Sequence, residues 1–406
     1  MTSLCPVAED ENSAAPSLTL GEVLRTFLPA AADQLNLGAR PRRVLGLLAA
    51  CGLPELGANI YRCDQCQSLH FGPRSCGDRH CPRCLAAKSR HWLQQQLDSL
   101  LPIPYYHCVF TLPEPLHTLV QLNPTELYPL FFDCASQTLL EFGRNRLGGD
   151  LGLTALLHTW GQQLNFHPHL HCIVTGGALR SDGQNWRSPK QRKFLFPVRA
   201  LAALFRGKFL HGLQARLDQD PPLRLPDNVP APGLDRRRWF SQLYAQRWVV
   251  YAKRPFGGPD QVLAYLANYT HRVAISNRRI LALDPQAQTV TFTWRDYRHR
   301  AQVQTCTLSA TQFIRRFSWH ILPAGLVRIR HYGILANNRR HRDIAHARKI
   351  LQRQSRRQPL KPVAHLAPLP PLCCPNCGKQ ALRWIGFIDA HGHLHLKASI
   401  PLADSS

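Results

Sequence analysis

The chain has 406 residues, 44% of them hydrophobic, so it is long enough to bury at least one sizeable core, and a disordered tail is excluded. Lysine and arginine outnumber aspartate and glutamate by 50 to 25. The net charge of +25 predicts a polyanionic partner, because neutralised phosphates release counterions, and favours DNA over a membrane. Segment 1–17 does not have the character of a signal peptide, and no stretch is apolar for long enough to span a bilayer, so we expect a cytoplasmic protein without a membrane partner.

Apolar residues recur at helical spacing in the N-terminal part of the chain. In residues 18–58 this spacing begins with Leu20 and Val23, and it predicts two amphipathic helices. A cysteine-rich segment follows at 61–84, and residues 86–101 again have the periodicity of a helix. The pattern predicts a small cysteine-rich module with a helical lead-in.

The periodicity changes near residue 106. Residues 106–112 and 169–174 are short runs of strand character, and a long helical stretch around 126–142 lies between them. This mixture predicts an α+β domain.

Prolines and basic residues mark the later connections. Residues 219–234 contain five prolines and are predicted to form an exposed loop or insertion. A second proline-rich linker occupies 359–371. Residues 331–357 are densely basic with interspersed apolar positions, which indicates a helix that presents cations to solvent or to phosphate.

Two CxxC knuckles, separated by fourteen residues, follow the predicted N-terminal helices. This spacing is typical of a zinc site in which each knuckle supplies two thiolates to a tetrahedral ion. In a cytosolic chain the cysteines are reduced, so a metal explains the knuckles better than disulfides do. Four thiolates close the coordination sphere, so the predicted role is structural rather than catalytic. The predicted zinc ligands are Cys63, Cys66, Cys81 and Cys84.

Other donors leave alternatives open. Cys76 and His80 lie between the knuckles, and either could replace a cysteine as ligand or support the site from outside. Near the C-terminus, Cys374 and Cys377 form one further knuckle beside Cys373. That segment is either a second zinc site or a decayed ribbon or small β-hairpin with exposed histidines. The nearest further donors there are His391, His393 and His395. We expect the remaining cysteines to be scattered core thiols.

Basic residues surround the first knuckles and recur later in the chain. A zinc-organised module with basic flanks is a plausible DNA-recognition element, and the alternative is a solvated cationic face. Lys208, Arg328 and Arg330 are candidates for phosphate contacts, although each is equally well a solvated cation.

One predicted strand carries two histidines that could form part of a metal site. His169 and His171 are two residues apart, so on a strand both imidazoles project from one face and form half of a metal site. For the third ligand we favour Gln162 on a preceding antiparallel strand, with His158 and Gln163 as rivals. Two imidazoles and an amide oxygen leave positions open on Mg²⁺ or Mn²⁺ for a phosphate oxygen. The alternative is a satisfied histidine pair without a metal.

Two tyrosines stand four residues apart. If this segment is a helix, Tyr265 and Tyr269 share one face. Val262 and Leu266 lie on the same stripe, so an aromatic core face is the competing interpretation.

The order of these motifs, a strand at 109–113, then the His-Leu-His strand, then the Tyr-x3-Tyr segment, resembles the HUH nucleases. More closely, it resembles the two-tyrosine bacterial insertion-sequence transposases, in which a cysteine-rich zinc domain precedes the catalytic domain. The resemblance covers roughly residues 20–350. It implies an HUH nuclease-like antiparallel sheet with flanking helices, preceded by a small zinc-finger module. It makes His169 and His171 metal ligands and both tyrosines nucleophiles, while relatives with one tyrosine leave open whether both are needed.

The resemblance also implies a function. The chain is expected to bind insertion-sequence ends, as single strands or hairpins, and to cleave and rejoin single-stranded DNA through a 5′-phosphotyrosine intermediate. Zn²⁺ is the expected structural cofactor, and Mg²⁺ or Mn²⁺ the catalytic one. Metal proximity or nearby cations such as His271 and Arg272 are expected to favour phenolate, and both are candidates for DNA contact. No phosphate-binding loop of the helicase type is present, so strand opening is expected to depend on replication, supercoiling or a host helicase.

Competing functions are an HUH replication initiator or relaxase, a zinc-finger DNA-binding protein without catalysis, and a nuclease that uses three carboxylates and two metals. The expected organisation is an N-terminal helical lead-in (1–60), a zinc-binding DNA-recognition module (61–100), a tyrosine nuclease domain (101–330), a basic helix with a proline-rich linker (331–372) and a cysteine and histidine tail (373–406).

Overall fold

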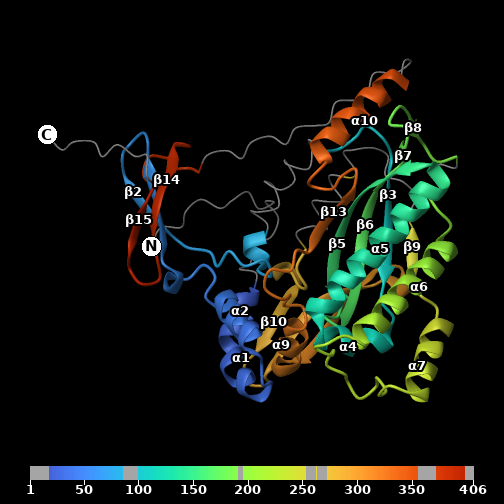
Figure 1. The fold of residues 1–406 in the computed structure, drawn as a ribbon. Coiled ribbons are helices and arrows are strands. Elements are labelled where there is room, and N and C mark those ends of the chain that lie inside the picture. The colour runs from blue at the N-terminus through green and yellow to red at the C-terminus, as the bar shows by residue number, and fades with distance from the viewer. Residues whose placement is uncertain are drawn as a thin grey trace. The chain divides into compact units, whose positions relative to one another are not determined.

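The computed structural model describes residues 18–85, 99–190, 195–252, 262, 272–354 and 372–397. The chain divides into two compact units (Figure 1). Unit 1 combines residues 1–88, 275–318 and 366–406, and unit 2 combines residues 89–274 and 319–365. Both units contain helices and antiparallel sheets, so the expected α+β class is confirmed.

Unit 2 is built on a five-stranded antiparallel sheet with the order β13-β5-β6-β3-β9. The predicted strands at 106–112 and 169–174 are confirmed as β3 and β6 in the centre of this sheet. A tight turn at 161–165, in which Leu164 has a φ of +59°, joins β5 to β6. The strands are β3 (Tyr105–Thr111), β5 (Gly152–Trp160), β6 (Phe166–Thr175), β9 (Val250–Ala252) and β13 (Ile329–Gly333).

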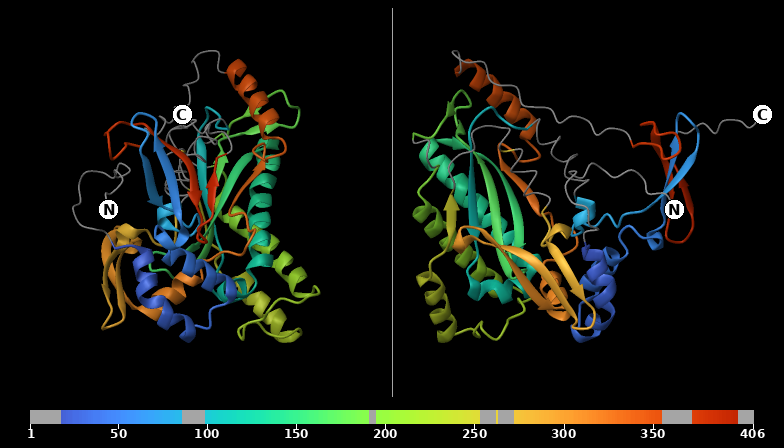
Figure 2. Two further views of the ribbon diagram at one scale, coloured as in Figure 1. Left: turned by 90° about the vertical axis from the view of Figure 1, so that its left-hand side faces the viewer. Right: turned by 180° about the vertical axis from the view of Figure 1, so that it is seen from behind.

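Helices cover one face of this sheet (Figures 1 and 2). The two long helices α5 (Pro124–Leu147) and α6 (Val198–Leu217) pack against each other and bury a large apolar core with the sheet. Leu170 and Cys172 of β6 point into this core and are fully buried. Side chains alternate along a strand, so His169 and His171 occupy the other face. Shorter helices, α4 (His117–Leu122) and α7 (Leu234–Ala245), complete this part of unit 2.

The histidine-bearing face is covered by a second apolar cluster. Leu156 and Ile173 of the sheet contribute to it, as do α10 (Arg340–Gln354) and Val262. A small sheet, β4-β7-β8, lies in the same unit; its strands are β4 (Gly149–Asp150), β7 (Ala178–Arg180) and β8 (Trp186–Arg187).

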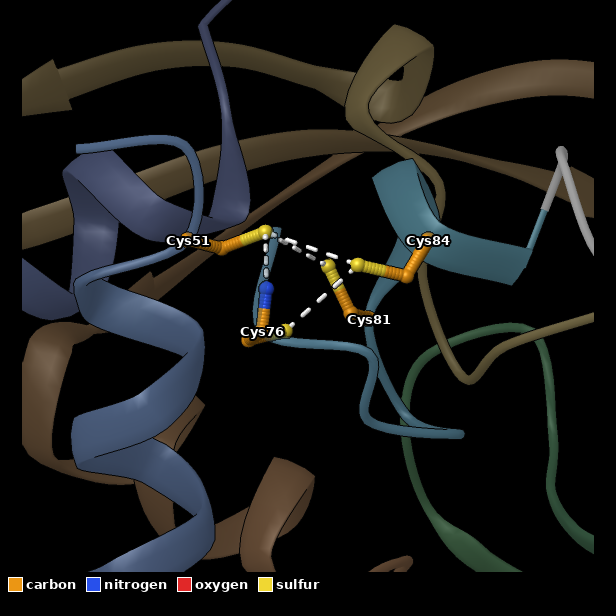
Figure 3. Close-up of side chains that lie close together, drawn as sticks. All are labelled: Cys51, Cys76, Cys81 and Cys84. Atoms are coloured by element: carbon orange, nitrogen blue, oxygen red, sulfur yellow. Dashed lines mark hydrogen bonds between the residues drawn. The ribbon is translucent and has the colours of Figure 1, made fainter. Parts of the chain in front are cut away.

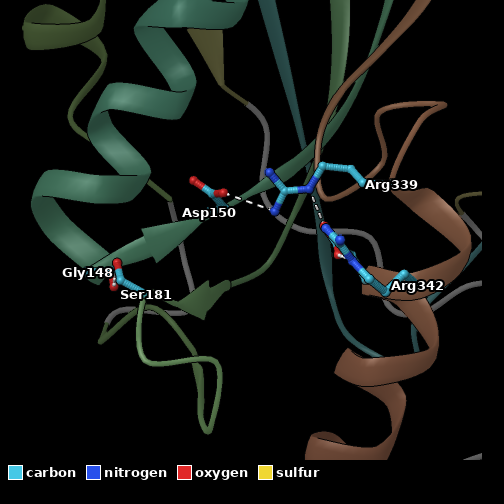
Figure 4. Close-up of polar contacts among 6 residues, drawn as sticks. Gly148, Asp150, Ser181, Arg339 and Arg342 are labelled. Atoms are coloured by element: carbon cyan, nitrogen blue, oxygen red, sulfur yellow. Dashed lines mark hydrogen bonds and ion pairs between the residues drawn. The ribbon is translucent and has the colours of Figure 1, made fainter.

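Ion pairs connect α10 to this small sheet (Figure 4). Arg339 donates to the carboxylate of Asp150 at 3.2 Å and also pairs with Asp343, which is 5% exposed. Arg342 donates to the Asp343 carboxylate at 3.0 Å. Two guanidinium groups therefore compensate the one buried charge, and the start of α10 is fixed.

Unit 1 begins with two helices. In α1 (Leu20–Gln34) the side chain of Thr19 accepts from the backbone of Glu22, whose carboxylate accepts from Thr19 in return, which satisfies the first turn. The helix α2 (Ala39–Ala49) follows, so the two predicted N-terminal helices are confirmed. The helix α1 also packs on α9 (Ala310–Ser318), which follows the antiparallel sheet β10-β11-β12. The strands of that sheet are β10 (Ile280–Asp284), β11 (Thr289–Asp296) and β12 (Gln302–Ser309).

A second sheet of unit 1, with the order β15-β14-β1-β2, joins segments that are far apart in the chain. The strands β1 (Ala58–Cys63) and β2 (Leu69–Pro73) form a hairpin, and β14 (Leu382–Ile388) pairs antiparallel with β1 and continues into β15 (Leu394–Leu396). Figure 1 shows these red strands beside the blue ones. This differs from the expected organisation, which placed residues 373–406 in a separate tail and residues 275–318 in the nuclease domain.

The proline-rich segment and the basic helix were also predicted from the sequence. Residues 219–233 contain no helix or strand, as the prolines predict. The predicted basic helix at 331–357 is confirmed only from Arg340, because residues 331–333 pair with β5 instead. Most of the predicted helix at 86–101 and the proline-rich linker lie outside the described residues. No described helix combines the length and apolarity needed to cross a bilayer.

Candidate metal centres

Three histidines converge at one end of the central sheet of unit 2. The antiparallel register places His158 of β5 directly opposite His169 of β6, and His171 lies two residues further along the same face. The ring centroid of His158 is 5.6 Å from that of His169 and 4.7 Å from that of His171. One nitrogen from each imidazole lies within 4.8 Å of the others. Cross-strand pairing therefore collects three donors in one place.

Hydrogen bonds orient two of these rings. His169 Nδ1 lies 2.7 Å from the carbonyl oxygen of His167, so it carries a hydrogen and donates, which leaves Nε2 as the basic nitrogen. His171 Nδ1 lies 2.9 Å from Nε2 of His107, a buried residue of β3. Metal-binding histidines commonly engage their second ring nitrogen in this way, which fixes the tautomer and the ring orientation.

Burial keeps the imidazoles of His169 and His171 neutral. It lowers the pKa of His169 to about 4, and the nearby His167 adds to the effect. The pKa of His171 is lowered well below its usual value, first by burial and then by the neighbouring His158 and His169. Arg272 lies close enough to contribute in the same direction. At neutral pH His169 and His171 are therefore unprotonated, which is the form that binds metal ions.

The expected third ligand, Gln162, is not on a strand. The strand β5 ends at Trp160, and Gln162 falls in the turn to β6, because the chain reverses within five residues there. His158, which the sequence analysis kept as a rival, is still on the strand and faces His169. The geometry therefore favours His158 as the third donor.

The two predicted nucleophiles, Tyr265 and Tyr269, lie outside the described residues, as does His271. The nearest described residue on the N-terminal side of this segment is Val262, which is helical and fully buried. Val262 packs in the cluster that contains Leu156 and Ile173, on the histidine-bearing face of the sheet. Val262 therefore lies on the face that carries the three histidines.

The basic candidates of unit 2 occupy different environments. Lys208 of α6 pairs with Glu141 of α5 at 2.9 Å, so it has a partner within the helical layer. The guanidinium of Arg330 lies 4.4 Å above the ring of Phe132 on α5. Arg328 donates to the backbone carbonyl of Arg272 at 3.4 Å, and Arg272 in turn lies near His171. Arg272 and Arg328 are therefore the candidates associated with the histidine group.

Four cysteines of unit 1 form one thiol group (Figure 3). Cys84 Sγ lies 3.6 Å from the sulfur atoms of both Cys51 and Cys76, and Cys81 Sγ lies 3.5 Å from that of Cys51. Hydrogen bonds from Cys76 and then from Cys81 lower the pKa of the Cys51 thiol to about 7. Cys51 therefore has the thiolate character that zinc requires.

A second thiol group of unit 1 combines distant segments. Cys63 Sγ lies 3.7 Å from that of Cys377, and Cys66 Sγ lies 3.6 Å from that of Cys374. Burial opposes ionisation of Cys374, but hydrogen bonds from the backbone of Cys377 and from Ser68 outweigh it and lower its pKa to about 5.

The expected site with ligands from both N-terminal knuckles is therefore wrong in its grouping, because each knuckle has different partners. The hairpin β1–β2 holds the first knuckle against β14, whereas the second knuckle begins a short helical turn beside the end of α2. Cys76 joins the second knuckle, as one alternative allowed, and His80 instead pairs with Asp78 at 2.7 Å.

Sequence reasoning missed Cys51. It stands alone directly after α2, without the repeated spacing that marks a knuckle. Gly52, with a φ of +81°, turns the chain there, and a side chain at this position would collide with Arg83. Only the folded arrangement identifies Cys51 as a member of the group.

Comparison with known families identifies two domains in this chain. A family model described as "Putative transposase" matches residues 152–342, and one described as "Transposase zinc-binding domain" matches residues 23–112. A protein named "Putative transposase y4qJ" from Sinorhizobium fredii (strain NBRC 101917 / NGR234) is 41% identical over 324 residues, which cover 79% of this chain and 80% of that protein. The chain belongs to this family of transposases.

A second relative of this transposase is the "Transposase for insertion sequence element IS801" of Pseudomonas savastanoi pv. phaseolicola. It is 31% identical over 292 residues, which cover 71% of this chain and 69% of that protein. A solved structure of the conjugative relaxase TrwC in complex with oriT DNA, in a metal-free state, is 15% identical, with a TM-score of 0.21 and coverage of 60% of this chain and 71% of that chain. The zinc-binding domain of the transposase includes both N-terminal knuckles, and its match ends before the C-terminal knuckle.

Proposed function

We propose that this transposase binds the ends of an insertion sequence and cleaves and rejoins single-stranded DNA through a covalent 5′-phosphotyrosine intermediate, as in rolling-circle transposition. The observation that carries the proposal is the group of three imidazoles at the end of β5 and β6. The strongly basic composition supports a DNA substrate, since lysine and arginine outnumber the acidic residues by 50 to 25.

The donor set suits a divalent metal. Three imidazoles converge, and the group contains no carboxylate among the residues that the structure describes. Imidazole binds borderline metals better than hard ones, so His158, His169 and His171 favour Mn²⁺ over Mg²⁺. A bound divalent ion would supply Lewis-acid stabilisation of the scissile phosphate and of the departing 3′ oxygen. Three protein ligands leave coordination positions for the substrate.

Chain connectivity supports a tyrosine nucleophile at the same place. Val262 is buried on the histidine-bearing face, in contact with the cluster of Leu156 and Ile173. Tyr265 and Tyr269 follow by three and seven residues, so the backbone can carry them at most about 11 Å and 25 Å from Val262. Both tyrosines therefore follow closely in the sequence a residue that is buried on the face with the proposed metal ligands.

The proposed reaction uses the tyrosine oxygen as nucleophile. This oxygen forms a bond to the scissile phosphorus, and the bond from phosphorus to the 3′ oxygen breaks with its electron pair. The 3′ oxygen then takes up a proton and leaves as a 3′-hydroxyl. A phenol has a pKa of about 10, so it must first lose its proton, and the positive charge of Arg272 favours the phenolate.

The covalent intermediate explains how joining proceeds without ATP. The phosphotyrosine bond conserves the energy of the phosphodiester, so a 3′-hydroxyl can attack it and expel the tyrosine. With two tyrosines, the second could cleave the target or the other end of the element. A replication initiator or relaxase would use the same chemistry, and a zinc-finger protein without catalysis would form no covalent product.

A covalent-adduct assay tests the proposal. The purified full-length protein is incubated with end-labelled single strands from the flanks of its own gene, with Mn²⁺, Mg²⁺ or EDTA, and analysed by denaturing electrophoresis. We expect a labelled adduct with Mn²⁺, a weaker one with Mg²⁺ and none with EDTA. The adduct should be lost in the Tyr265→Phe, Tyr269→Phe double variant.

The exposed Tyr297, in the other unit, provides a matched control. Tyr297→Phe should form as much adduct as the wild type. Binding of DNA without any adduct, with both metals and several end strands, would favour the zinc-finger alternative. Metal-dependent cleavage without an adduct would favour a carboxylate nuclease instead.

A further inference from the structure

The C-terminal knuckle repeats the local backbone of the first knuckle. In each, the first cysteine accepts from the backbone N–H four residues later, at 2.9 Å for Cys63 and 2.8 Å for Cys374. In each, that same cysteine donates its own N–H to the carbonyl oxygen five residues later, at 3.0 Å and 2.8 Å. The residues that follow the second cysteines, Gln67 and Gly378, both have positive φ, of 57° and 70°. The two knuckles are therefore matching halves of one structure.

Backbone pairing brings the two halves together. In the register of β1 with β14, Cys63 lies opposite Leu382, five residues after the last cysteine of the C-terminal knuckle. Asp64, inside the first knuckle, donates its N–H to the carbonyl oxygen of Ala381 at 2.9 Å. The juxtaposition of the thiols therefore follows from a continuous sheet and not from side-chain placement alone.

The sulfur separations match a tetrahedral zinc site. A Zn–S distance of about 2.3 Å implies about 3.8 Å between sulfur atoms at the corners of a tetrahedron. The contacts that cross between the knuckles are 3.7 Å from Cys63 to Cys377 and 3.6 Å from Cys66 to Cys374. A disulfide requires about 2.05 Å, so the four thiols are not oxidised pairs.

Polar groups around the sulfur atoms complete the resemblance to a metal site. The hydroxyl of Ser68 lies 2.9 Å from Cys66 Sγ, and the amide of Asn376 donates to the same sulfur at 3.6 Å. Nε2 of His70 lies 3.2 Å from Cys374 Sγ and 2.9 Å from the Ser68 hydroxyl. Outer partners of this kind orient metal ligands and stabilise thiolates.

We propose that Cys63, Cys66, Cys374 and Cys377 bind a structural zinc ion, separate from the zinc-binding group of Cys51, Cys76, Cys81 and Cys84. Four thiolates leave no open position, so this ion takes no part in catalysis. It fastens β14 to the β1–β2 hairpin, and the transposase then holds two zinc ions per chain. This inference does not depend on the proposed function.

Zinc content per chain tests the proposal. Full-length variants are purified in parallel, and zinc is measured by mass spectrometry against protein concentration. The wild type should contain two equivalents. The Cys374→Ser, Cys377→Ser variant and the Cys63→Ser, Cys66→Ser variant should each lose one equivalent, and combining all four substitutions should lose no more. Adding Cys81→Ser and Cys84→Ser to the C-terminal pair should remove both equivalents.

Cys373 provides the matched control, because it adjoins the knuckle but is outside the thiol group. Cys373→Ser should keep two equivalents. The proposal is overturned if the C-terminal double variant also keeps two, or if the losses from the C-terminal and the 63/66 substitutions add.

Alkylation of cysteines separates loss of one site from general misfolding. In the Cys374→Ser, Cys377→Ser variant, Cys63 and Cys66 should become reactive toward iodoacetamide, while Cys81 and Cys84 stay protected. Peptide mass spectrometry reports each cysteine separately. Protection that persists at Cys63 and Cys66 in this variant would overturn the proposal. It would also be overturned if Cys81 and Cys84 became reactive in the variant under conditions that leave them protected in the wild type, because the zinc loss would then reflect general misfolding.

Discussion

The histidine group of unit 2 and the thiol groups of unit 1 are assembled in opposite ways. The three histidines come from two adjacent strands within fourteen residues of the chain, from His158 to His171. The thiol group around β1 instead joins cysteines that are 308 and 314 residues apart. The first depends on one β-turn and its register, and the second depends on the fold of a whole unit.

The two kinds of centre also differ in how open they are. A metal held by three imidazoles would have room for a substrate, whereas four thiolates would enclose it. An open centre suits chemistry, and a closed one suits stability. Substitutions in the two centres should therefore separate activity from folding.

Histidine and cysteine substitutions should have opposite consequences. His169→Ala removes one of three imidazoles, and we expect metal-dependent adduct formation to fall about 1,000-fold, since a catalytic metal supplies several kcal/mol. The melting temperature should change little. The Cys81→Ser, Cys84→Ser variant should instead unfold unit 1 at lower temperature and retain some cleavage of single strands. Single-turnover adduct assays and calorimetry measure both quantities.

The control is His211→Ala, at an exposed position on α6 in the helical layer. It should behave as the wild type in both measurements. A His169→Ala protein with full activity would contradict the proposed catalytic role of the histidine group.

The next largest effect concerns His331, which lies on the histidine-bearing face but outside the group of three. Burial, and then Arg340, lower its pKa to about 4, and its Nδ1 lies 2.9 Å from the hydroxyl of Thr154. Its folded pKa is below the unfolded value of about 6.5, so its neutral form stabilises the fold above pH 6.5. That contribution, about 3 kcal/mol at most, should be lost as the pH falls from 6.5 to about 4.

Urea unfolding of wild type and His331→Asn across this pH range measures the contribution. The difference between the two free energies of unfolding should shrink as the pH falls. A difference that stays constant from pH 7 to 4 would show that His331 does not titrate as described.

A smaller effect, on metal affinity, is expected from substitution of His107, whose Nε2 is hydrogen-bonded to Nδ1 of His171. His107→Phe removes the partner without opening space, and we expect metal affinity at the histidine group to fall by about 10–100-fold. His107→Gln keeps a hydrogen-bond acceptor and should recover part of the affinity. Mn²⁺ titration by calorimetry distinguishes the two, and equal affinity in both variants would leave His107 with a packing role alone.

The smallest expected effects concern the salt dependence of DNA binding, which should distinguish Arg272 from Lys208. Arg272→Gln should reduce the salt dependence of single-strand binding by about 0.7 in the slope of log K against log salt, as for one phosphate contact. Lys208→Gln should leave this slope unchanged, because Lys208 already pairs with Glu141. Fluorescence anisotropy at several salt concentrations tests both, and a reduced slope for Lys208→Gln would restore it as a DNA contact.

The sequence could predict features that depend on neighbouring residues. Alternation along a strand was enough to place His169 and His171 on one face, and helical periodicity was enough for α1 and α5. The sequence could not decide whether Gln162 or His158 is the third donor beside His169 and His171, because that choice depends on where β5 ends.

The sequence could not predict which cysteines from distant segments come together. CxxC spacing identified each knuckle as half of a site but contained no information about which half it meets. Cys51 has no local pattern at all, since its partners come from the loop and turn at 76–84. The roles of Tyr265 and Tyr269 remain predictions.

The pairing of β1 with β14 has a consequence for biosynthesis. The ribosome must add 308 residues between Cys66 and Cys374, which takes roughly 15 to 60 s at 5–20 residues per second. During this interval β1 has no neighbour on the side that β14 will occupy. Only two of the four thiols of the group, those of the first knuckle, have then been synthesised. A prematurely terminated chain keeps that exposed edge permanently, which offers cellular proteases and chaperones a means to recognise incomplete copies.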